Sequence, residues 1–219
     1  MRNKIASDEK LKAMTLIDFS IFCAFNGHEL LTTFADDKDG DSSILDFTVH
    51  CLHYDDIVHK KDSIEYRVFL IIGFFVQAKD VEKVYMDDGK TKTEEFRILT
   101  QCLECEIEHY SDITKGKLIF MPICARKHYF VYCINLIHNR INIFDSIDYF
   151  WADTSPEPCH QPIYAKLPII NAVFKKVTEN KFPQFDNWSR PFIDVSKQAG
   201  PSDCMFSYGN IWNSGMLRV

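Results

Sequence analysis

Two neighbouring apolar segments, joined by a short polar turn, constrain the fold of this chain more than any other feature. The first, "HYFVYCINLI" (residues 128–137), is apolar on both faces, as expected for a central buried strand. In the second, "RINIFDS" (residues 140–146), isoleucines alternate with polar residues. His138 and Asn139 supply turn chemistry between them. We therefore predict an antiparallel strand pair inside a sheet.

A helix is predicted before these strands. In "SSILDFTVHCLHYDDIV", apolar residues recur at helical spacing, and Ser42 or Ser43 is a suitable N-cap. The residues at this spacing are Ile44, Phe47, Cys51, Tyr54 and Val58. Further along the chain we predict the following elements: a strand-like run at 67–76, a charged helix at 80–100, a short strand "KLIFMPI" that ends at Pro122, a loop at 152–162, and a helix after Pro168.

The order of helix, strands and helices predicts the α+β class, and 219 residues fit one domain spanning 1–219. Apolar residues make up 46% of the chain, which indicates a globular protein. The net charge of -6 and the lack of a basic stripe argue against a general nucleic-acid binder. The stretch "MRNKIASDEKLKAM" is polar and lacks the apolar core of a signal peptide, and the most apolar run, "VFLIIGFFV", is far shorter than the about 20 residues of a membrane span.

We therefore expect an intracellular protein of the nucleus or cytoplasm, with its eight cysteines reduced. Two local patterns are interpreted as structural. The single CxxC at Cys102 and Cys105 lacks the partners of a zinc site, so an ordinary helical pair is favoured. The acidic loop "DDKDGD" does not match a calcium loop, because with Gly40 at its sixth position the first ligand would be Ala35.

Cys204 is the candidate nucleophile. A cysteine attacks as a thiolate, so its pKa must be lowered by a helix N-terminus or a protonated histidine. A turn precedes Cys204, Ser202 is a competent N-cap, and Met205, Tyr208 and Trp212 follow on one helical face. Taken alone, Cys204 is more often an inert buried thiol than a catalytic group.

His128 and Asp145 are the candidate base and its orienting carboxylate, because they lie at the start of the first strand and the end of the second. A turn centred on Leu136-Ile137 would place the two residues face to face. A turn centred on His138-Asn139 would place Asp145 opposite Tyr132 instead, so the register stays open at this stage.

Gln198, six residues before Cys204, completes the set. Attack on an amide carbonyl places negative charge on its oxygen, and a side-chain amide can donate a hydrogen bond to that oxygen. Each of the four residues is a weak signal alone. The order His128, Asp145, Gln198, Cys204, with a strand pair and a helix start, is more specific.

These segments resemble the Ulp1/SENP-type cysteine proteases (peptidase family C48), in the divergent form common in plants. The matching stretches are "LIFMPICARKHYFVYCINLIHNRINIFDS" and "DVSKQAGPSDCMFSYGNIW", within residues 117–212. In the family a histidine opens one strand, Asp-Ser closes the next, and a glutamine stands six residues before the cysteine of an Asp-Cys pair. His128, Asp145-Ser146, Gln198 and Asp203-Cys204 occupy these positions.

The resemblance implies a papain-like fold with a central mixed sheet flanked by helices. It also implies hydrolysis after the C-terminal Gly-Gly of a ubiquitin-like modifier of the SUMO type, for deconjugation or maturation. Cys204 would be the nucleophile, His128 the base, Asp145 its orienter and Gln198 the oxyanion donor. The expected partners are that modifier and its conjugates, without nucleic acid or membrane, and the protein is expected to be a monomer. No metal or cofactor is implied.

Three features depart from the family pattern. Tyr129 replaces its Trp, Met205 replaces the Gly after the nucleophile, and the chain ends fifteen residues after Cys204, where the family continues with helical structure. These departures leave open the alternative that the protein is a catalytically impaired family member, which only binds a modifier or another protein. A protease for ubiquitin or another modifier is a third possibility.

Overall fold

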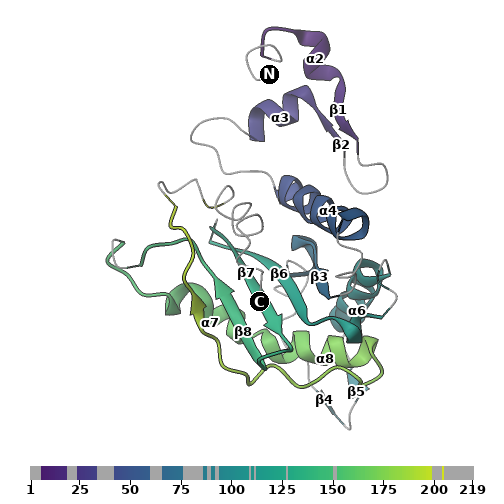
Figure 1. Cartoon of the computed structure of the whole chain (residues 1–219), viewed down its shortest axis with the longest axis vertical. Helices are drawn as coiled ribbons and strands as arrows, with labels where there is room; N and C mark the ends of the chain where they lie inside the picture. Colours follow the sequence, from purple (N-terminus) through teal and green to yellow (C-terminus); the bar gives the residue numbers. More distant parts are fainter. Residues whose placement is uncertain are drawn as a thin grey trace.

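A computed structural model describes residues 6–18, 24–33, 42–59, 66–75, 86–87, 90–91, 94–108, 110, 112–126, 128–149, 152–198 and 204. Figure 1 shows the arrangement of the elements. They are α2 (Glu9–Ala13), β1 (Thr15–Asp18), β2 (Ala24–Asn26), α3 (Gly27–Thr33), α4 (Ser42–His59), β3 (Arg67–Phe69), β4 (Met86–Asp87), β5 (Lys90–Thr91), α6 (Glu94–Ile107), the 3₁₀ turn η2 (Ile113–Lys115), β6 (Leu118–Ala125), β7 (His128–Asn135), β8 (Arg140–Phe144), α7 (Glu157–Tyr164), α8 (Leu167–Val177) and β9 (Phe192–Ile193).

The centre of the fold is a five-stranded mixed sheet in the order β3-β6-β7-β8-β9. The inner pairs β6–β7 and β7–β8 are antiparallel, while the outer pairs β3–β6 and β8–β9 are parallel. All eight residues of β7 are buried, as the apolar character of both its faces predicts. The α+β class and the mixed sheet flanked by helices are confirmed.

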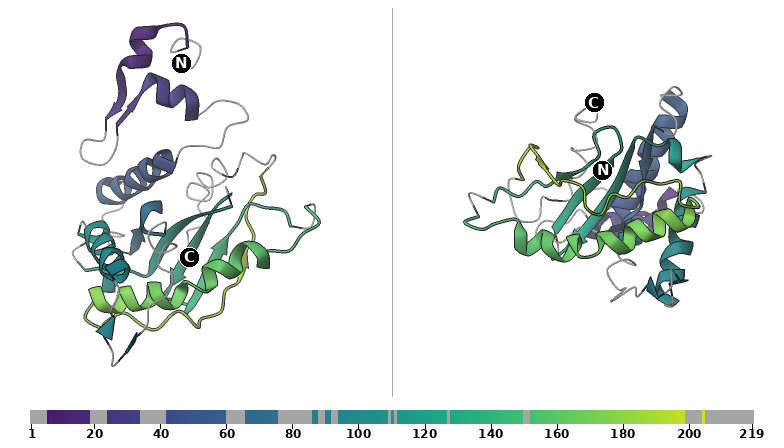
Figure 2. Two further views of the ribbon diagram at one scale, coloured as in Figure 1. Left: turned by 180° about the vertical axis from the view of Figure 1, so that it is seen from behind. Right: turned by 90° about the horizontal axis from the view of Figure 1, so that it is seen from below.

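Different helices cover the two faces of this sheet (Figures 1 and 2). Alternate strand residues such as Phe130 and Ile134 pack with α6 and α8 in one apolar cluster. The intervening residues, including Val131 and Cys133, pack with α4 in the other cluster, which also contains Cys204. Because side chains alternate between the faces of a strand, the hairpin joins both layers.

The turn between β7 and β8 takes a register between the two that the sequence left open. Asn135 pairs with Arg140 and Val131 with Phe144, so the turn is centred on residues 137 and 138. Four residues, 136–139, form the loop, and Asn139 takes the left-handed conformation with φ 49°. The side chain of Asn135 accepts hydrogen bonds from the backbone N–H groups of Ile137 and His138. This Asx-type cap holds the loop in the observed register.

Pro122 does not end β6, contrary to prediction. The strand continues to Ala125, and Pro122 pairs with Val131. The backbone of Phe120 points towards β3, since its carbonyl accepts from the N–H of Leu70. Two residues on, the nitrogen of Pro122 faces the same side, where the paired part of β3 has already ended at Phe69. A proline without an N–H is tolerated there because no ladder bond is lost.

Three other boundaries also differ from prediction. The run at 67–76 is strand only over Arg67–Phe69, and residues 72–75 form a helical turn. The helix expected at 80–100 is α6, which begins at Glu94 and follows the short pair β4–β5. The loop expected at 152–162 contains the start of α7. The predicted helices at α4 and α8 are confirmed.

The N-terminal part is a small unit of α2, α3 and the antiparallel pair β1–β2, which lies beyond α4 from the sheet (Figure 1). The Asp8 side chain caps α2 by accepting from two backbone N–H groups. At the start of α3, Asn26 accepts from the N–H of Glu29, and Glu29 accepts from the N–H of Asn26. This reciprocal pair is a capping box. Within the described residues, no helix is long and apolar enough to span a bilayer.

A partly buried carboxylate on α6, that of Glu106, holds the 72–75 turn against the sheet. Glu106 accepts a hydrogen bond from the N–H of Ile71 at 2.9 Å, and the Cys102 thiol donates to its other oxygen. Burial raises the pKa of Glu106 from its ordinary value of 4.5 to about 8, and the hydrogen bonds from Ile71 and Cys102 offset only part of this effect. Glu106 is therefore protonated in the folded protein over a range in which the unfolded chain is ionised.

This difference predicts a pH dependence of stability. Between pH 5 and 8 the folded state keeps a proton that the unfolded state releases, so the free energy of unfolding falls as the pH rises. In Glu106→Gln we expect this fall to be smaller by roughly 2–3 kcal/mol, measured by urea unfolding at both pH values. Glu104→Gln, at an exposed site on the same helix, is the control. An identical fall in Glu106→Gln and wild type would contradict the prediction.

Candidate active site

His128 and Asp145 meet at one end of the central strand pair. Val131 pairs with Phe144, the last residue of β8, so continuing this register by one residue would place Asp145 opposite Phe130, two residues after His128. Residues two apart on a strand share a face, so His128 and Asp145 are diagonal neighbours, which long side chains can bridge. His128 Nε2 lies 2.7 Å from Asp145 Oδ1, and both side chains are buried. The structure therefore brings these two predicted residues together without a bend.

The Asp145 carboxylate is fully hydrogen-bonded. Oδ1 is contacted by His128 and by the N–H of Ile147 at 2.9 Å. Oδ2 accepts from the Tyr149 hydroxyl at 2.6 Å and is 2.9 Å from Nε2 of His160. Burial tends to raise the pKa of Asp145, but the bonds from His128 and His160 outweigh it and hold the pKa well below its usual range. The carboxylate is therefore ionised throughout the neutral range.

Cys204 lies on the other side of His128. It is buried and belongs to the same apolar cluster as Tyr129 and Val131. Burial alone would lower the pKa of His128, but hydrogen bonds with Asp145 and with Cys204 raise it to about 9. Since Nε2 is engaged by Asp145, Nδ1 is the ring nitrogen left for the sulfur. At neutral pH His128 is thus an imidazolium, the partner that favours the thiolate form of a cysteine.

Gln198 is tied to the residue after Asp145. Its backbone N–H donates to the carbonyl of Ser146 at 2.9 Å, and the Ser146 hydroxyl donates to its side-chain Oε1, also at 2.9 Å. With Oε1 occupied as an acceptor, the Nε2 donors of the amide are left for another group. The Asp145-Ser146 pair thus contacts both His128 and Gln198.

Two sequence features at the site lie outside the described residues: the N-cap Ser202 and the helix face marked by Met205, Tyr208 and Trp212. Tyr129, which stands where the family has Trp, is buried beside Val131. Within the described residues, no cluster of three or more His, Cys, Asp or Glu side chains could hold a metal ion. Cys102 and Cys105 both lie on α6, as the helical interpretation predicted.

Sequence reasoning missed His160, the second histidine on Asp145. It lies on α7, in the segment predicted as a loop because of its prolines. A helix-start signal was present, since Pro158 stands in the first turn and Glu157 supplies an acidic residue there. Its contact with Asp145 depends on the packing of α7 against the sheet, which local sequence does not encode.

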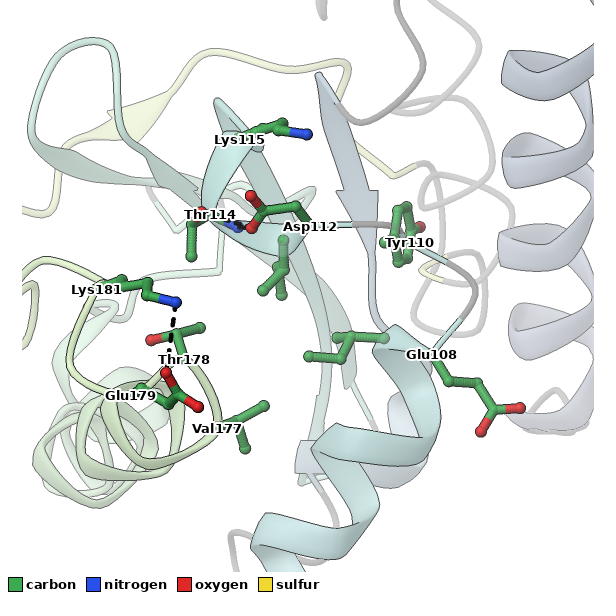
Figure 3. A pocket seen from close by; sticks show the side chains of 11 residues that line it. Glu108, Tyr110, Asp112, Thr114, Lys115, Val177, Thr178, Glu179 and Lys181 are labelled. Atoms are coloured by element: carbon green, nitrogen blue, oxygen red, sulfur yellow. Dashed lines mark hydrogen bonds and ion pairs between the residues drawn. The ribbon is translucent and has the colours of Figure 1, made fainter.

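An open hollow of about 700 Å³ lies away from this site (Figure 3). It is lined by residues from the end of α6, the η2 turn and the end of α8, with Asp112, Lys115, Glu179 and Lys181 at its rim. These elements adjoin the Leu118 end of β6, whereas His128 pairs with Ala125 at the opposite end. The eight residues of β6 span about 25 Å, so the hollow is separate from the candidate site.

A cysteine, a histidine and a carboxylate that meet at one end of the central strands of an α+β sheet place the chain in the class of the cysteine peptidases. The model of the Ulp1 protease family, C-terminal catalytic domain, matches residues 42–207, and the chain belongs to this family. A search of curated protein sequences gives no match.

Solved structures share this fold. The C-terminal Ulp1 protease domain in complex with SMT3, the yeast ortholog of SUMO, is 14% identical, with a TM-score of 0.64 over 98% of this chain and 81% of that one. The Ulp1-like SUMO protease catalytic domain of Chaetomium thermophilum is 13% identical, with a TM-score of 0.63 over 96% of this chain and 76% of that one. At such identities the likeness shows the fold alone.

Proposed function

We propose that this chain is a single-domain cysteine peptidase that cleaves after the C-terminal Gly-Gly of a SUMO-type modifier, for maturation or deconjugation. The observation that carries the proposal is the placement of His128 between the Asp145 carboxylate and the Cys204 thiol. Membership of the Ulp1 family supports the reaction class. The similar Ulp1 domain was solved in complex with SMT3, the yeast ortholog of SUMO, which supports the SUMO type as the modifier.

The first half of the reaction forms a thioester. The Cys204 thiolate attacks the carbonyl carbon of the modifier's terminal glycine, and the carbonyl electrons move onto oxygen. As the tetrahedral intermediate collapses, the C–N bond breaks and the His128 imidazolium gives its Nδ1 proton to the departing amine. Asp145 stays ionised and holds the ring through Nε2.

The second half hydrolyses the thioester. Neutral His128 takes a proton from water, whose oxygen attacks the same carbonyl carbon, and the C–S bond then breaks to release the carboxylate. In both halves the developing oxyanion needs donors. Gln198 is the proposed side-chain donor, because the Ser146 hydroxyl occupies Oε1 and so fixes the amide with Nε2 as its donor end.

A turnover assay tests this function. Purified protein is mixed with SUMO-type and ubiquitin-type modifiers whose C-terminal Gly-Gly carries a fluorogenic amide. We expect release of the fluorophore from the SUMO type, and loss of turnover by a factor of at least about 10³ in Cys204→Ala, because the nucleophile is gone. Cys105→Ala, at an exposed thiol on α6, is the matched control and retains activity.

Other outcomes would favour the alternatives. Met205 after the candidate nucleophile motivates an impaired member that only binds its partner. If the modifier binds without turnover, and with equal affinity to wild type and Cys204→Ala, that binding function would be supported and the proposed peptidase activity would be overturned. Turnover of the ubiquitin-type substrate alone would support the peptidase activity but identify a different modifier as its substrate.

A further inference from the structure

His160 is a fully buried histidine to which the proposed reaction gives no role. Its side chain is 0% exposed, and Nε2 lies 2.9 Å from Asp145 Oδ2. The other carboxylate oxygen, Oδ1, contacts His128. One carboxylate therefore joins two imidazole rings, and one of them, His128, is also hydrogen-bonded to Cys204.

The hydrogen bonds of His160 define its tautomer. An ionised carboxylate can only accept, so Nε2 of His160 must carry the proton that it shares with Asp145. At the other side of the ring, the Tyr132 hydroxyl lies 2.8 Å from Nδ1 and can donate to its lone pair. Tyr132 is itself hydrogen-bonded to Tyr164, so the chain of donors continues beyond the histidine.

Packing fixes the orientation of the ring. Aromatic side chains from β7 and β9, from α7 and from the segment after β8 surround it, and the ring is nearly parallel to that of Tyr132, with 13° between the planes. The surrounding residues are Phe130, Tyr132, Tyr149, Tyr164 and Phe192. A flipped ring would place carbon atoms where both nitrogens now bond, which would leave Tyr132 and Asp145 without these partners.

The consequence for the site concerns the plane of the Asp145 carboxylate. Asp145 lies just beyond the end of β8, where the strand ladder no longer restrains it. The bonds of Tyr149 and His160 to Oδ2, together with the bond of the Ile147 N–H to Oδ1, set the rotation of the carboxylate, and that rotation presents Oδ1 to His128. We propose that His160 is a positioning residue, which acts on the reaction through Asp145 and His128. This inference rests on the proposed function.

Kinetics of two substitutions test it. His160→Phe keeps a ring in the aromatic site but removes both nitrogens, whereas His160→Gln keeps an N–H near the position of Nε2. We expect His160→Phe to lower kcat by about 10- to 100-fold with KM for the modifier substrate unchanged, because a small displacement of the base slows chemistry more than binding. His160→Gln should recover most of kcat. Thr178→Val removes a buried hydroxyl that bonds the backbone of Phe174 and Phe182, and it serves as the control for lost stability alone.

If His160→Phe does not fold, Tyr149→Phe provides a second test, because it removes the other side-chain donor from Oδ2 together with a hydroxyl that lies 3.1 Å from His160 Nε2. A decrease in kcat at constant KM is expected there as well, smaller than that for His160→Phe. Equal kcat in wild type, His160→Phe and Tyr149→Phe would overturn the proposal. An equal loss in His160→Phe, His160→Gln and Thr178→Val would do the same, since it would show a structural role only.

A spectroscopic measurement separates this inference from the proposed function. In protein labelled with ¹⁵N-histidine, we expect His160 as the Nε2–H tautomer and a slowly exchanging Nε2–H signal from His128. The His128 signal should exchange much faster in His160→Phe and be restored in His160→Gln. This pattern in a protein without turnover would refute the proposed function and retain the positioning role. A His128 signal unchanged in His160→Phe would refute the positioning role.

Discussion

Replacing His128 by alanine is expected to lower kcat for cleavage of a SUMO-type modifier substrate by about 10³- to 10⁴-fold. The imidazole is the hydrogen-bonded partner of Cys204, and its pKa of about 9 keeps it protonated at neutral pH. Its loss would remove the cation that stabilises the thiolate and the acid that protonates the leaving amine. Steady-state kinetics at pH 7.5, at saturating substrate, measure the effect.

A second histidine in the same strand pair provides the control. His138 lies in the exposed turn between β7 and β8, so His138→Ala changes a histidine on the same hairpin without touching Asp145. Its kcat should equal that of wild type. A kcat in His128→Ala within about tenfold of wild type would contradict the proposed role, because one general acid–base group contributes more than that.

The largest expected effect on stability lies at the junction of α4 and the sheet. Arg67 at the start of β3 pairs with Asp56 of α4 through two hydrogen bonds, with Nε 2.9 Å from Oδ2. The side chains are 11% and 5% exposed, and the guanidinium also lies 5.4 Å from the ring centroid of Phe69. Removal of either partner would leave the other charge buried without its ion-pair partner, which costs about 3–5 kcal/mol.

We therefore expect Asp56→Ala to lower the free energy of unfolding by about that amount in urea titrations followed by circular dichroism. The double variant Asp56→Ala/Arg67→Ala should lose less than the sum of the two single variants, because the second change removes the stranded charge. Lys12→Ala breaks the exposed pair with Glu9 and is the control, with an expected loss below about 1 kcal/mol. A loss equally small in Asp56→Ala would show that the buried pair does not hold α4 in place.

Local sequence predicted the elements whose apolar residues follow a regular pattern. β7 was predicted because both its faces are apolar, and α4 and α8 because apolar residues recur at helical spacing. Features that depend on contacts with neighbouring strands or helices were not predictable in this way. A proline usually marks the end of a strand. Pro122 is tolerated inside β6 because the paired part of β3 ends before it.

The candidate site shows the same division. His128, Asp145, Gln198 and Cys204 could be proposed because their order and spacing resemble a family pattern. The register that brings His128 to Asp145 is set by a four-residue loop, which the Asn135 side chain caps. This register differs from both of those considered from the sequence. His160 reaches Asp145 only through the packing of α7, so no spacing along the chain announces it.

The central claim is that Cys204 is the nucleophile of a cysteine peptidase. Its most direct test is reaction of the wild-type protein with a SUMO-type modifier carrying an electrophile in place of its terminal glycine, followed by peptide mass spectrometry. We predict one adduct, on the peptide containing Cys204, and none in Cys204→Ala. An adduct on another cysteine, or labelling that persists in Cys204→Ala, would contradict the claim.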